Sequence, residues 1–270
     1  MNLTDICLNL SNSQFKSDID EVLDRAKAAM VSRLLVVGTD LESSQFCADW
    51  AKRYEQLFAT AGVHPHDADN VPNHWLEEIR TLALQDNVVA IGETGIDLNR
   101  NYSSREGQVA CFRDQISLAA ELGMPLFVHD RESDGLVLDM LKTFDTALGV
   151  VIHCFTGTEE ELENYLSAGY SIGITGWICD VRRGQNLREM IAKIPLEQLL
   201  IETDAPFLRP HNTPKNWLDE HNLSNQYKRR CEPAMLPFVL QTVAEHRTES
   251  IEEIASATHR NATRLFNLPE

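Results

Sequence analysis

The sequence predicts an α/β fold, a closed (β/α)8 TIM barrel. Short apolar runs alternate with longer amphipathic stretches along the chain of 270 residues, and eight such strand-then-helix units within about 250 residues are typical of this barrel. Most runs are continuously apolar, as expected for strands that are buried on both faces. Polar side chains follow many of the runs, and a barrel mouth collects side chains from all of its strands. We therefore expect a single domain that spans residues 1–270.

Eight apolar runs are the expected strands. They are Leu3–Leu8, Leu34–Gly38, Leu57–Gly62, Val88–Gly92, Pro125–His129, Gly149–His153, Tyr170–Thr175 and Leu199–Thr203. Three helix starts show a hydroxyl residue with Glu three positions later, the capping-box pattern. The pairs are Ser103 with Glu106, Thr158 with Glu161, and Ser250 with Glu253. The alternative fold is an open doubly wound sheet, but no Gly-x-Gly-x-x-Gly follows the first run.

The composition limits the classes of partner. No apolar run approaches the roughly 18 residues that a membrane span needs, so we expect no membrane partner. A net charge of −17 argues against a broad surface that binds duplex nucleic acid. It leaves open a nucleic-acid substrate that is held by a metal ion and a few local basic residues. The six cysteines form no Cys-x-x-Cys pair, which indicates reduced thiols and a cytoplasmic location.

Carboxylate or imidazole groups stand at the ends of four apolar runs: Glu93, His129, His153 and Asp204. Each one alone is compatible with a strand-end cap, a salt bridge or a hydrogen-bonded core residue. A carboxylate that follows a buried strand is costly unless it binds a cation or a donor. Four such groups at the carboxyl ends of strands in one barrel would meet at one mouth. The pattern therefore predicts a metal site that can activate water.

Further polar residues lie at the same expected mouth. His64 and His66 flank Pro65 after the third run, and they are either exposed imidazoles of a structural turn or hydrogen-bond donors to a substrate phosphate. Arg131 is either a phosphate clamp, which suits the guanidinium fork, or a partner of Asp130 or Glu132.

Asp97 and Asn99 follow Glu93 closely. The sequence does not separate a role in orienting metal ligands from a plain loop role for these two residues.

The segment Arg209–Pro233 is polar and irregular and follows the eighth run. Long loops of this kind are usually functional or disordered. The segment ends near Lys228-Arg229-Arg230, either a solvated basic turn or a contact to the substrate backbone. The chain contains neither a Gly-x-Ser-x-Gly elbow nor a P-loop, so a serine hydrolase or nucleoside triphosphatase has no support.

Together these motifs resemble the TatD family of metal-dependent deoxyribonucleases, within the amidohydrolase-like barrel superfamily. The resemblance covers nearly the whole chain. It is carried by 61–66 (AGVHPH), 91–97 (IGETGID), 127–131 (FVHDR), 152–157 (IHCFTG), 200–208 (LIETDAPFL) and 260–266 (RNATRLF). Most relatives have His-x-His at the end of the first strand, where this chain has Cys7 and Asn9. We therefore expect one well-held metal ion and a second that is weakly held or held partly by the substrate.

The resemblance implies a 3′–5′ exonuclease that hydrolyses phosphodiester bonds of single-stranded DNA and RNA, with a possible role in DNA repair or degradation. It implies a divalent cation, with Mg2+ as the first choice and Mn2+ or Zn2+ as alternatives. Our hypothesis assigns metal binding to Glu93, His129, His153 and Asp204, catalysis to Asp204 and Glu93, and substrate binding to His64, His66 and Arg131. We expect a monomer. Trp177, Phe155 and Phe207 are candidates for stacking on bases, with core packing as the alternative for each.

Two other functions remain open at this point. One is a metal-dependent amidohydrolase that acts on a small cyclic amide or lactone, although such enzymes typically keep His-x-His and a bridging lysine. The other is a nucleic-acid binding module that has lost catalysis together with the first-strand histidines.

Overall fold

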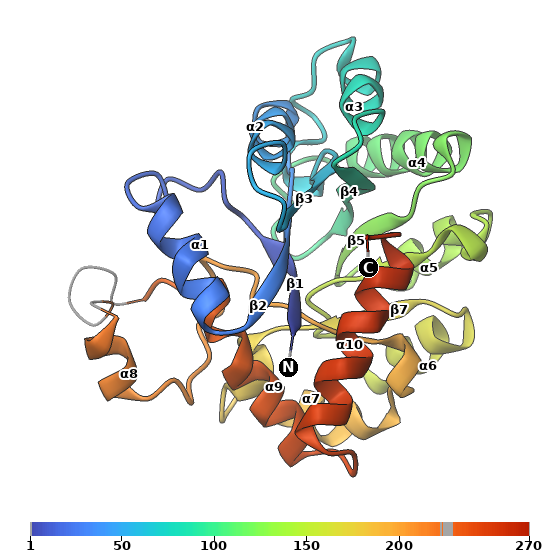
Figure 1. Cartoon of the computed structure of the whole chain (residues 1–270). Helices are drawn as coiled ribbons and strands as arrows, with labels where there is room; N and C mark the ends of the chain where they lie inside the picture. The colour runs from blue at the N-terminus through green and yellow to red at the C-terminus, as the bar shows by residue number, and fades with distance from the viewer. Residues whose placement is uncertain (1, 222, 224–228, 270) are drawn as a thin grey trace.

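The computed structural model describes residues 2–221, 223 and 229–269 (Figure 1). Eight parallel strands form one sheet whose spatial order is the order of the sequence. The strands are β1 Leu3–Leu8, β2 Val31–Val36, β3 Leu57–Ala61, β4 Val88–Asp97, β5 Leu126–Arg131, β6 Val150–Ile152, β7 Ser171–Ile174 and β8 Leu199–Ile201. This order is that of a barrel and not of a doubly wound sheet, so the predicted fold class is confirmed.

The first and last strands meet at a seam that nearly closes the barrel. The backbone N–H of Asp204 donates to the carbonyl of Cys7 at 3.0 Å, and that of Asn9 donates to the carbonyl of Ala205 at 2.8 Å. Lower in the seam, Thr203 N donates to Asp5 Oδ1 at 2.9 Å. The buried Asp5 carboxylate therefore replaces part of a regular strand ladder between β1 and β8.

Helices surround the sheet (Figure 1). They are α1 Ile19–Ala28, α2 Leu41–Ala51, α3 Trp75–Ala83, α4 Arg105–Leu122, α5 Leu136–Leu141, α6 Glu159–Ser167, α7 Gln185–Met190, α8 Lys215–Glu220, α9 Leu236–Glu245 and α10 Ile251–Leu265. One apolar layer packs between strands and helices. A second cluster includes Leu35, Phe127 and Leu200 from the strands with Ala262 and Phe266 from α10 and its C-terminal end. Because side chains fill the interior of the barrel, a binding or catalytic site is expected at the carboxyl ends of the strands.

The predicted elements agree with the structure in type and order, but several strand bounds, such as the end of β5 at Arg131 and of β8 at Ile201, and one helix cap differ. β2 begins at Val31, three residues early, and β4 continues to Asp97, so Glu93 lies inside an extended strand. The predicted capping box at Ser103 is wrong: Ser104 caps α4, because its side chain accepts from Gly107 N while Ser103 Oγ donates to the carbonyl of His66. The capping boxes that begin α6 and α10 are confirmed.

The segment after β8 is more ordered than predicted, since it contains the short helix α8. Lys228 lies outside the described residues. Arg229 is exposed, whereas Arg230 is 1 % exposed and forms ion pairs with Asp18 and Glu232. For Arg230 both sequence-based interpretations are therefore wrong, because it is neither solvated nor available to a substrate phosphate.

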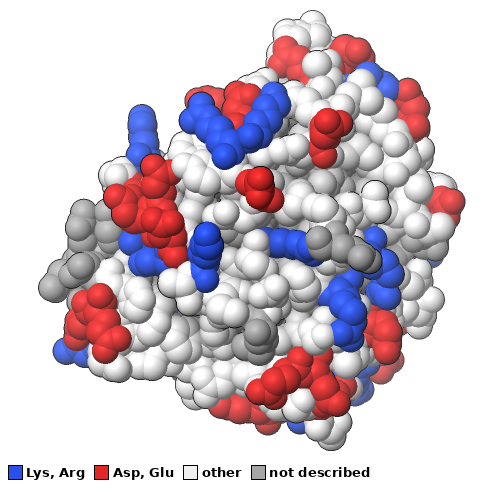
Figure 2. Space-filling model, in the orientation of Figure 1, with Lys and Arg blue, Asp and Glu red and all other residues white. Residues whose placement is uncertain are grey.

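The charged surface fits the composition. On the face shown in Figure 2, acidic and basic side chains form separate small groups and not one continuous basic surface.

All six cysteines are unpaired thiols, and Cys154 alone among them is only partly buried. No helix built from the described residues is both long and apolar enough to span a bilayer.

Candidate active site

A cavity of about 570 Å3 opens at the carboxyl ends of the strands. Its walls come from the carboxyl-terminal parts of the strands and the segments that follow them, with residues from all eight strand units. All seven residues that the sequence predicted for the site line it, namely His64, His66, Glu93, His129, Arg131, His153 and Asp204. The structure thus brings together side chains that are as much as 140 positions apart in the chain (204 − 64).

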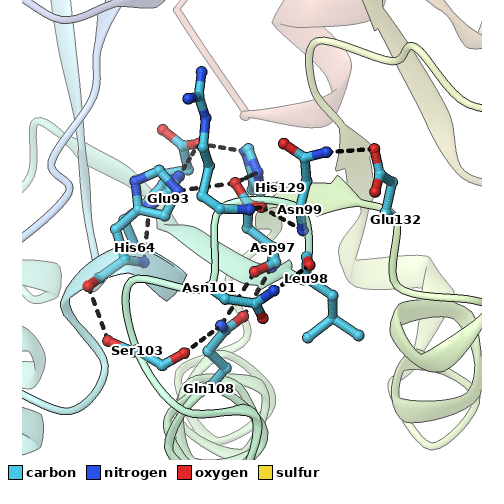
Figure 3. A network of polar contacts seen from close by, with 12 residues as sticks. His64, Glu93, Asp97, Leu98, Asn99, Asn101, Ser103, Gln108, His129 and Glu132 are labelled. Carbon is cyan, nitrogen blue, oxygen red and sulfur yellow. Dashed lines mark hydrogen bonds and ion pairs between the residues drawn. The ribbon is translucent and has the colours of Figure 1, made fainter.

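One oxygen of Glu93 is the centre of the site. His153 Nε2 lies 2.8 Å from Glu93 Oε1, and His129 Nδ1 lies 3.1 Å from the same oxygen. His64 Nε2 is 3.2 Å from it, and Figure 3 shows His64 and His129 on either side of Glu93. Three imidazoles from three different strand ends therefore converge on a single carboxylate that is 5 % exposed.

A glycine makes this placement possible. Gly92 has a φ of 141°, a conformation that residues with a side chain rarely adopt. A Cβ on Gly92 would lie 2.3 Å from the carbonyl oxygen of Phe127 on the neighbouring strand. The close approach of β4 and β5 that brings Glu93 beside His129 thus depends on glycine at position 92.

The charges of the cluster are strongly coupled. Burial alone would raise the pKa of Glu93, but His153 and His64 outweigh it and hold this pKa well below its ordinary value. Burial would lower the pKa of His153, but Glu93 and Glu202 raise it well above the ordinary value. Without a bound cation, Glu93 is therefore ionised and its closest imidazole partner is protonated. Burial lowers the pKa of His64 to about 4, so this imidazole is neutral at pH 7.

Asp97 orients two of the imidazoles. Its Oδ2 lies 2.8 Å from His66 Nε2 and 3.3 Å from His129 Nε2, and its backbone is held by the buried amide of Gln108. Figure 3 shows Asp97 between His129 and Gln108 in this network. The side chain of Asn99 instead donates to Glu132 at 2.6 Å. The two roles that the sequence left open are thus separated: Asp97 supports the site, and Asn99 is a loop residue.

Asp204 approaches the cavity from the opposite wall. Asn9 Nδ2 donates to Asp204 Oδ1 at 2.9 Å, and Asp204 has a φ of 55°, in the left-handed region. Burial raises the pKa of this carboxyl to about 7. Asn9, at the end of β1, therefore serves to orient a carboxylate.

Sequence reasoning missed Glu202. This side chain is fully buried, and its Oε1 accepts a hydrogen bond from the backbone N–H of Cys154. A signal was present: alternate residues of a strand face the same side, and Leu200 is part of the interior cluster. Glu202, two positions after it, is therefore directed inward as well.

The rim of the cavity carries cationic and aromatic side chains. Arg131 Nε is buried without a hydrogen-bond partner among the described residues, and no ion pair joins Arg131 to Asp130 or Glu132 within that part of the chain. Phe207 is 49 % exposed at the rim, whereas Phe155 is 3 % exposed. Of the aromatic residues considered for stacking, Phe155 is thus a core residue.

The donor atoms fit a divalent cation. His64, Glu93 and His129 each offer one ligand atom, and these atoms lie within 4.8 Å of one another. His153 Nδ1 is buried and forms no hydrogen bond among the described residues, with Glu202 Oε2 3.6 Å away. Buried polar atoms without partners are rare in folded proteins, and imidazole and carboxylate groups are common ligands of Zn2+, Mn2+ and Mg2+.

Comparisons with known proteins agree with this geometry. A family model described as TatD related DNase matches residues 4–267. The chain is 46% identical over 266 residues to the 3′-5′ ssDNA/RNA exonuclease TatD of Citrobacter rodentium, covering 98% of this chain and 97% of that protein. It is 45% identical over 266 residues to the protein of the same name from Escherichia coli K12, covering 98% of both. Among solved structures, a TatD homologue from Escherichia coli K12 superimposes with a TM-score of 0.87 at 29% identity, covering 99% of this chain and 98% of that one.

Proposed function

We propose, from the premise that the chain belongs to the family of TatD-related DNases, that it is a 3′–5′ exonuclease that hydrolyses phosphodiester bonds of single-stranded DNA and RNA. The observation that carries the proposal is the convergence of His64, His129 and His153 on one oxygen of Glu93 inside an open cavity. Membership in this family disfavours an amidohydrolase for small cyclic amides, and the convergence of ligand groups in the cavity disfavours a binding module without catalysis.

The enzymes of this family use divalent metal ions. Glu93, His129, His153 and Asp204 would hold the ion here. His64 also offers a ligand atom, within 4.8 Å of those of Glu93 and His129. Such an ion supplies Lewis-acid chemistry: it neutralises charge on the phosphate and makes water a better acid. We propose Mg2+ as the ion. Mn2+ and Zn2+ are the alternatives, because imidazole ligands suit them at least as well.

The residues of the chain divide the remaining work. Asp204 takes the proton of the water that attacks phosphorus, because its carboxylate lines the cavity beside the other ligands and is placed to act as a general base. The guanidinium of Arg131, which lines the cavity, donates to a phosphate oxygen. His66 and His64 add hydrogen bonds to the phosphate as negative charge develops on it.

A single-stranded end suits the shape and charge of the mouth. A terminal nucleotide needs only a few phosphate contacts together with stacking of its base. Phe207 and Trp177 stand at the rim, and Arg183 lies over the Trp177 ring at 4.3 Å. We propose these two rings as stacking faces. We also propose a monomeric enzyme of the cytoplasm with a role in DNA repair or degradation.

The direct experiment uses a 5′-labelled single-stranded oligonucleotide and protein that has been dialysed against EDTA. Stepwise shortening from the 3′ end should begin when Mg2+ is added and should not occur in EDTA. The same oligonucleotide with a blocked 3′ end is the control and should remain intact. Equal rates with and without EDTA, or internal cleavage of the blocked oligonucleotide, would contradict the proposal.

A further inference from the structure

A second cavity, of about 640 Å3, adjoins the cavity that holds the active site. The two cavities share a wall made by Asp130, Arg131, Thr156 and Trp177. The other walls of the second cavity come from the loops after β4, β5 and β6 and from α6 and α7. We call this second space the side cavity. Its volume lies within the range of roughly 300–1,000 Å3 that is typical of sites for small ligands, and the phosphodiester chemistry of the neighbouring site gives it no role.

The side cavity is more acidic than the active-site cavity. The carboxylates that line it are those of Asp130, Glu132, Asp134 and Glu161. Arg131, in the shared wall, is the only Lys or Arg among the described residues that line it. The active-site cavity is lined in addition by Arg100 and Arg183. A phosphate group is therefore favoured in the active-site cavity and disfavoured in the side cavity.

Neutral groups hold two of these carboxylates in place. Asn99 Nδ2 donates to Glu132 Oε1 at 2.6 Å, a contact that Figure 3 shows. Glu161 Oε2 accepts from the backbone N–H of Thr158 at 2.7 Å and from its hydroxyl at 3.0 Å. This second set of contacts lies at the N-terminus of α6, where a phosphate could otherwise bind. The Glu161 carboxylate thus fills the anion position of the helix and adds negative charge to the side cavity.

We propose that the side cavity receives the 3′-terminal nucleoside of the single strand and that its carboxylates exclude a further phosphate. This selectivity rests on the proposed function and would make attack begin at a 3′ end. The 3′-terminal nucleotide carries one phosphate, the scissile one, whereas an internal nucleotide is flanked by two. With the scissile phosphate beside Arg131, a terminal nucleoside brings only its sugar and base into the side cavity. An internal nucleotide would place a second phosphate among the carboxylates.

The lining of the side cavity suits an uncharged nucleoside. Trp177 stands in the shared wall, where a base that enters the side cavity would contact its ring. Thr156 and Asn186 supply hydrogen-bonding groups. Carboxylates accept hydrogen bonds from the 3′ hydroxyl and from the N–H groups of bases. The rest of the strand, which carries all the other phosphates, lies along the active-site cavity with Arg100 and Arg183.

The test compares two ligands that differ by one phosphate, deoxyadenosine 5′-monophosphate and deoxyadenosine 3′,5′-bisphosphate. The first is a product of the proposed exonuclease, and the second mimics an internal nucleotide. Calorimetric titration of the full-length protein with Mg2+ present gives both dissociation constants. Wild-type protein should bind the monophosphate at least about tenfold more tightly. This preference should shrink at high salt, because exposed charges are screened.

A triple variant removes charge from the side cavity, and it combines Glu132→Gln, Asp134→Asn and Glu161→Gln. The amide oxygens can still accept the hydrogen bonds from Asn99 and Thr158. Asp130 stays unchanged, because burial raises its pKa. The preference for the monophosphate should fall by about fivefold or more in the triple variant.

The matched control removes three exposed carboxylates of α6 and α7 that lie outside the side cavity, with Glu160→Gln, Glu163→Gln and Glu189→Gln. It changes the net charge by the same amount and should keep the wild-type preference. Thermal melts establish that each variant is folded. The single variant Glu132→Gln, which should show a smaller shift in the same direction, replaces the triple variant if that protein does not fold.

Equal affinities of wild-type protein for the two ligands, or no binding of either, would overturn the inference. A preference that persists in the triple variant, or that falls equally in the control, would overturn it too. Degradation of a single-stranded oligonucleotide with a 3′ hydroxyl is measured on the same samples. Degradation without the preference refutes the role of the side cavity alone, whereas the preference without degradation in any metal refutes the proposed function alone.

Discussion

Two buried clusters of charged residues differ in how completely their charges are paired. In the clamp, defined as Arg25, Arg230, Asp18 and Glu232, each guanidinium bonds to both carboxylates, as with Arg25 Nε to Glu232 Oε2 at 2.7 Å and Arg230 Nη1 to Asp18 Oδ1 at 2.8 Å. In the mouth cluster, defined as His64, Glu93, Asp97, His129, His153 and Asp204, three imidazoles instead share one oxygen of Glu93. The clamp pairs two cations with two carboxylates, whereas the mouth cluster crowds several ligand atoms around one point that opens to a cavity.

The difference separates stability from function. Removing one partner of a complete buried ion pair leaves an uncompensated charge and is strongly destabilising. Removing a group that is held in place for a ligand costs activity and often not stability. The clamp joins the segment after β8 to α1, and the mouth cluster stands at the ends of β3, β4, β5, β6 and β8. Substitutions in the clamp should therefore lower stability and leave activity nearly unchanged. Substitutions in the mouth cluster should lower activity and leave stability nearly unchanged.

The largest effect on activity is expected for Glu93→Gln. This change removes the negative charge that His64, His129 and His153 share, so we expect a rate loss on the order of 10³-fold with no loss of thermal stability. Oligonucleotide degradation and thermal melts measure the two quantities. Glu121→Gln, at an exposed carboxylate paired with Arg80, is the matched control and should keep wild-type rates. A Glu93→Gln enzyme with more than a tenth of the wild-type rate would contradict the assignment.

The largest effect on stability is expected for Arg230→Met. It leaves Arg25 as the single cation for the carboxylates of Asp18 and Glu232, so one negative charge is uncompensated, and the free energy of unfolding should fall by about 3–5 kcal/mol. Urea unfolding measures this loss, and the folded protein should keep its rate within about twofold. Arg80→Met removes an exposed partner of Glu121 and should change the stability little. The comparison fails if the Arg80 and Arg230 variants lose equal stability.

The pH dependence of metal-free stability should have opposite signs for the two clusters. Arg230 and Arg25 lower the pKa of Asp18 despite its burial, so the contribution of Asp18 is present above its unfolded pKa of about 3.9 and is lost as the pH falls below it. Burial raises the pKa of Asp204 to about 7, so its protonated form favours folding and stability is lost as the pH rises from about 4 through 7.

Urea unfolding in EDTA across this pH range measures both changes in the free energy of unfolding, the one due to Asp18 and the one due to Asp204. Asp18→Asn should reduce the loss of stability at acid pH. Asp204→Asn should reduce the slope of stability between about pH 4 and 7 without abolishing it, because burial raises the pKa of Asp5 to about 7 as well. An Asp204→Asn protein with the wild-type slope above pH 4 would show that burial does not control this carboxyl.

The smallest effect is expected for Asn9→Ala. Its side chain donates to Asp204 Oδ1, and loss of a group that orients a ligand or base typically lowers activity by about tenfold. Because Asn9 touches only this wall of the cavity, stability should change little. Kinetics on the oligonucleotide measure the change, and Asn9→Asp, which places a second carboxylate beside Asp204, should lower the rate further. An Asn9→Ala enzyme with unchanged kinetics would show that the hydrogen bond from Asn9 to Asp204 does not contribute to catalysis.

Local patterns predicted the strands and the mouth, because buried parallel strands are continuously apolar and their carboxyl ends meet. These patterns did not predict the roles of residues whose partners lie far away in the sequence. Ser104 and not Ser103 caps α4, since Asp69 from another loop binds Ser104. Arg230 looked like a solvated or phosphate-binding cation because Asp18 lies 212 positions away. Glu202 was overlooked although its spacing from Leu200 placed it on the inward face.

The central claim is that a divalent cation binds at the oxygen of Glu93 where three imidazoles meet. A crystal soaked in Mn2+ with a short single-stranded oligonucleotide, measured at the manganese absorption edge, tests it most directly. The account predicts an anomalous peak within bonding distance of Glu93 Oε1 and the terminal phosphate beside Arg131. A map without a peak there, in which His153 Nε2 still lies 2.8 Å from Glu93 Oε1, would contradict it.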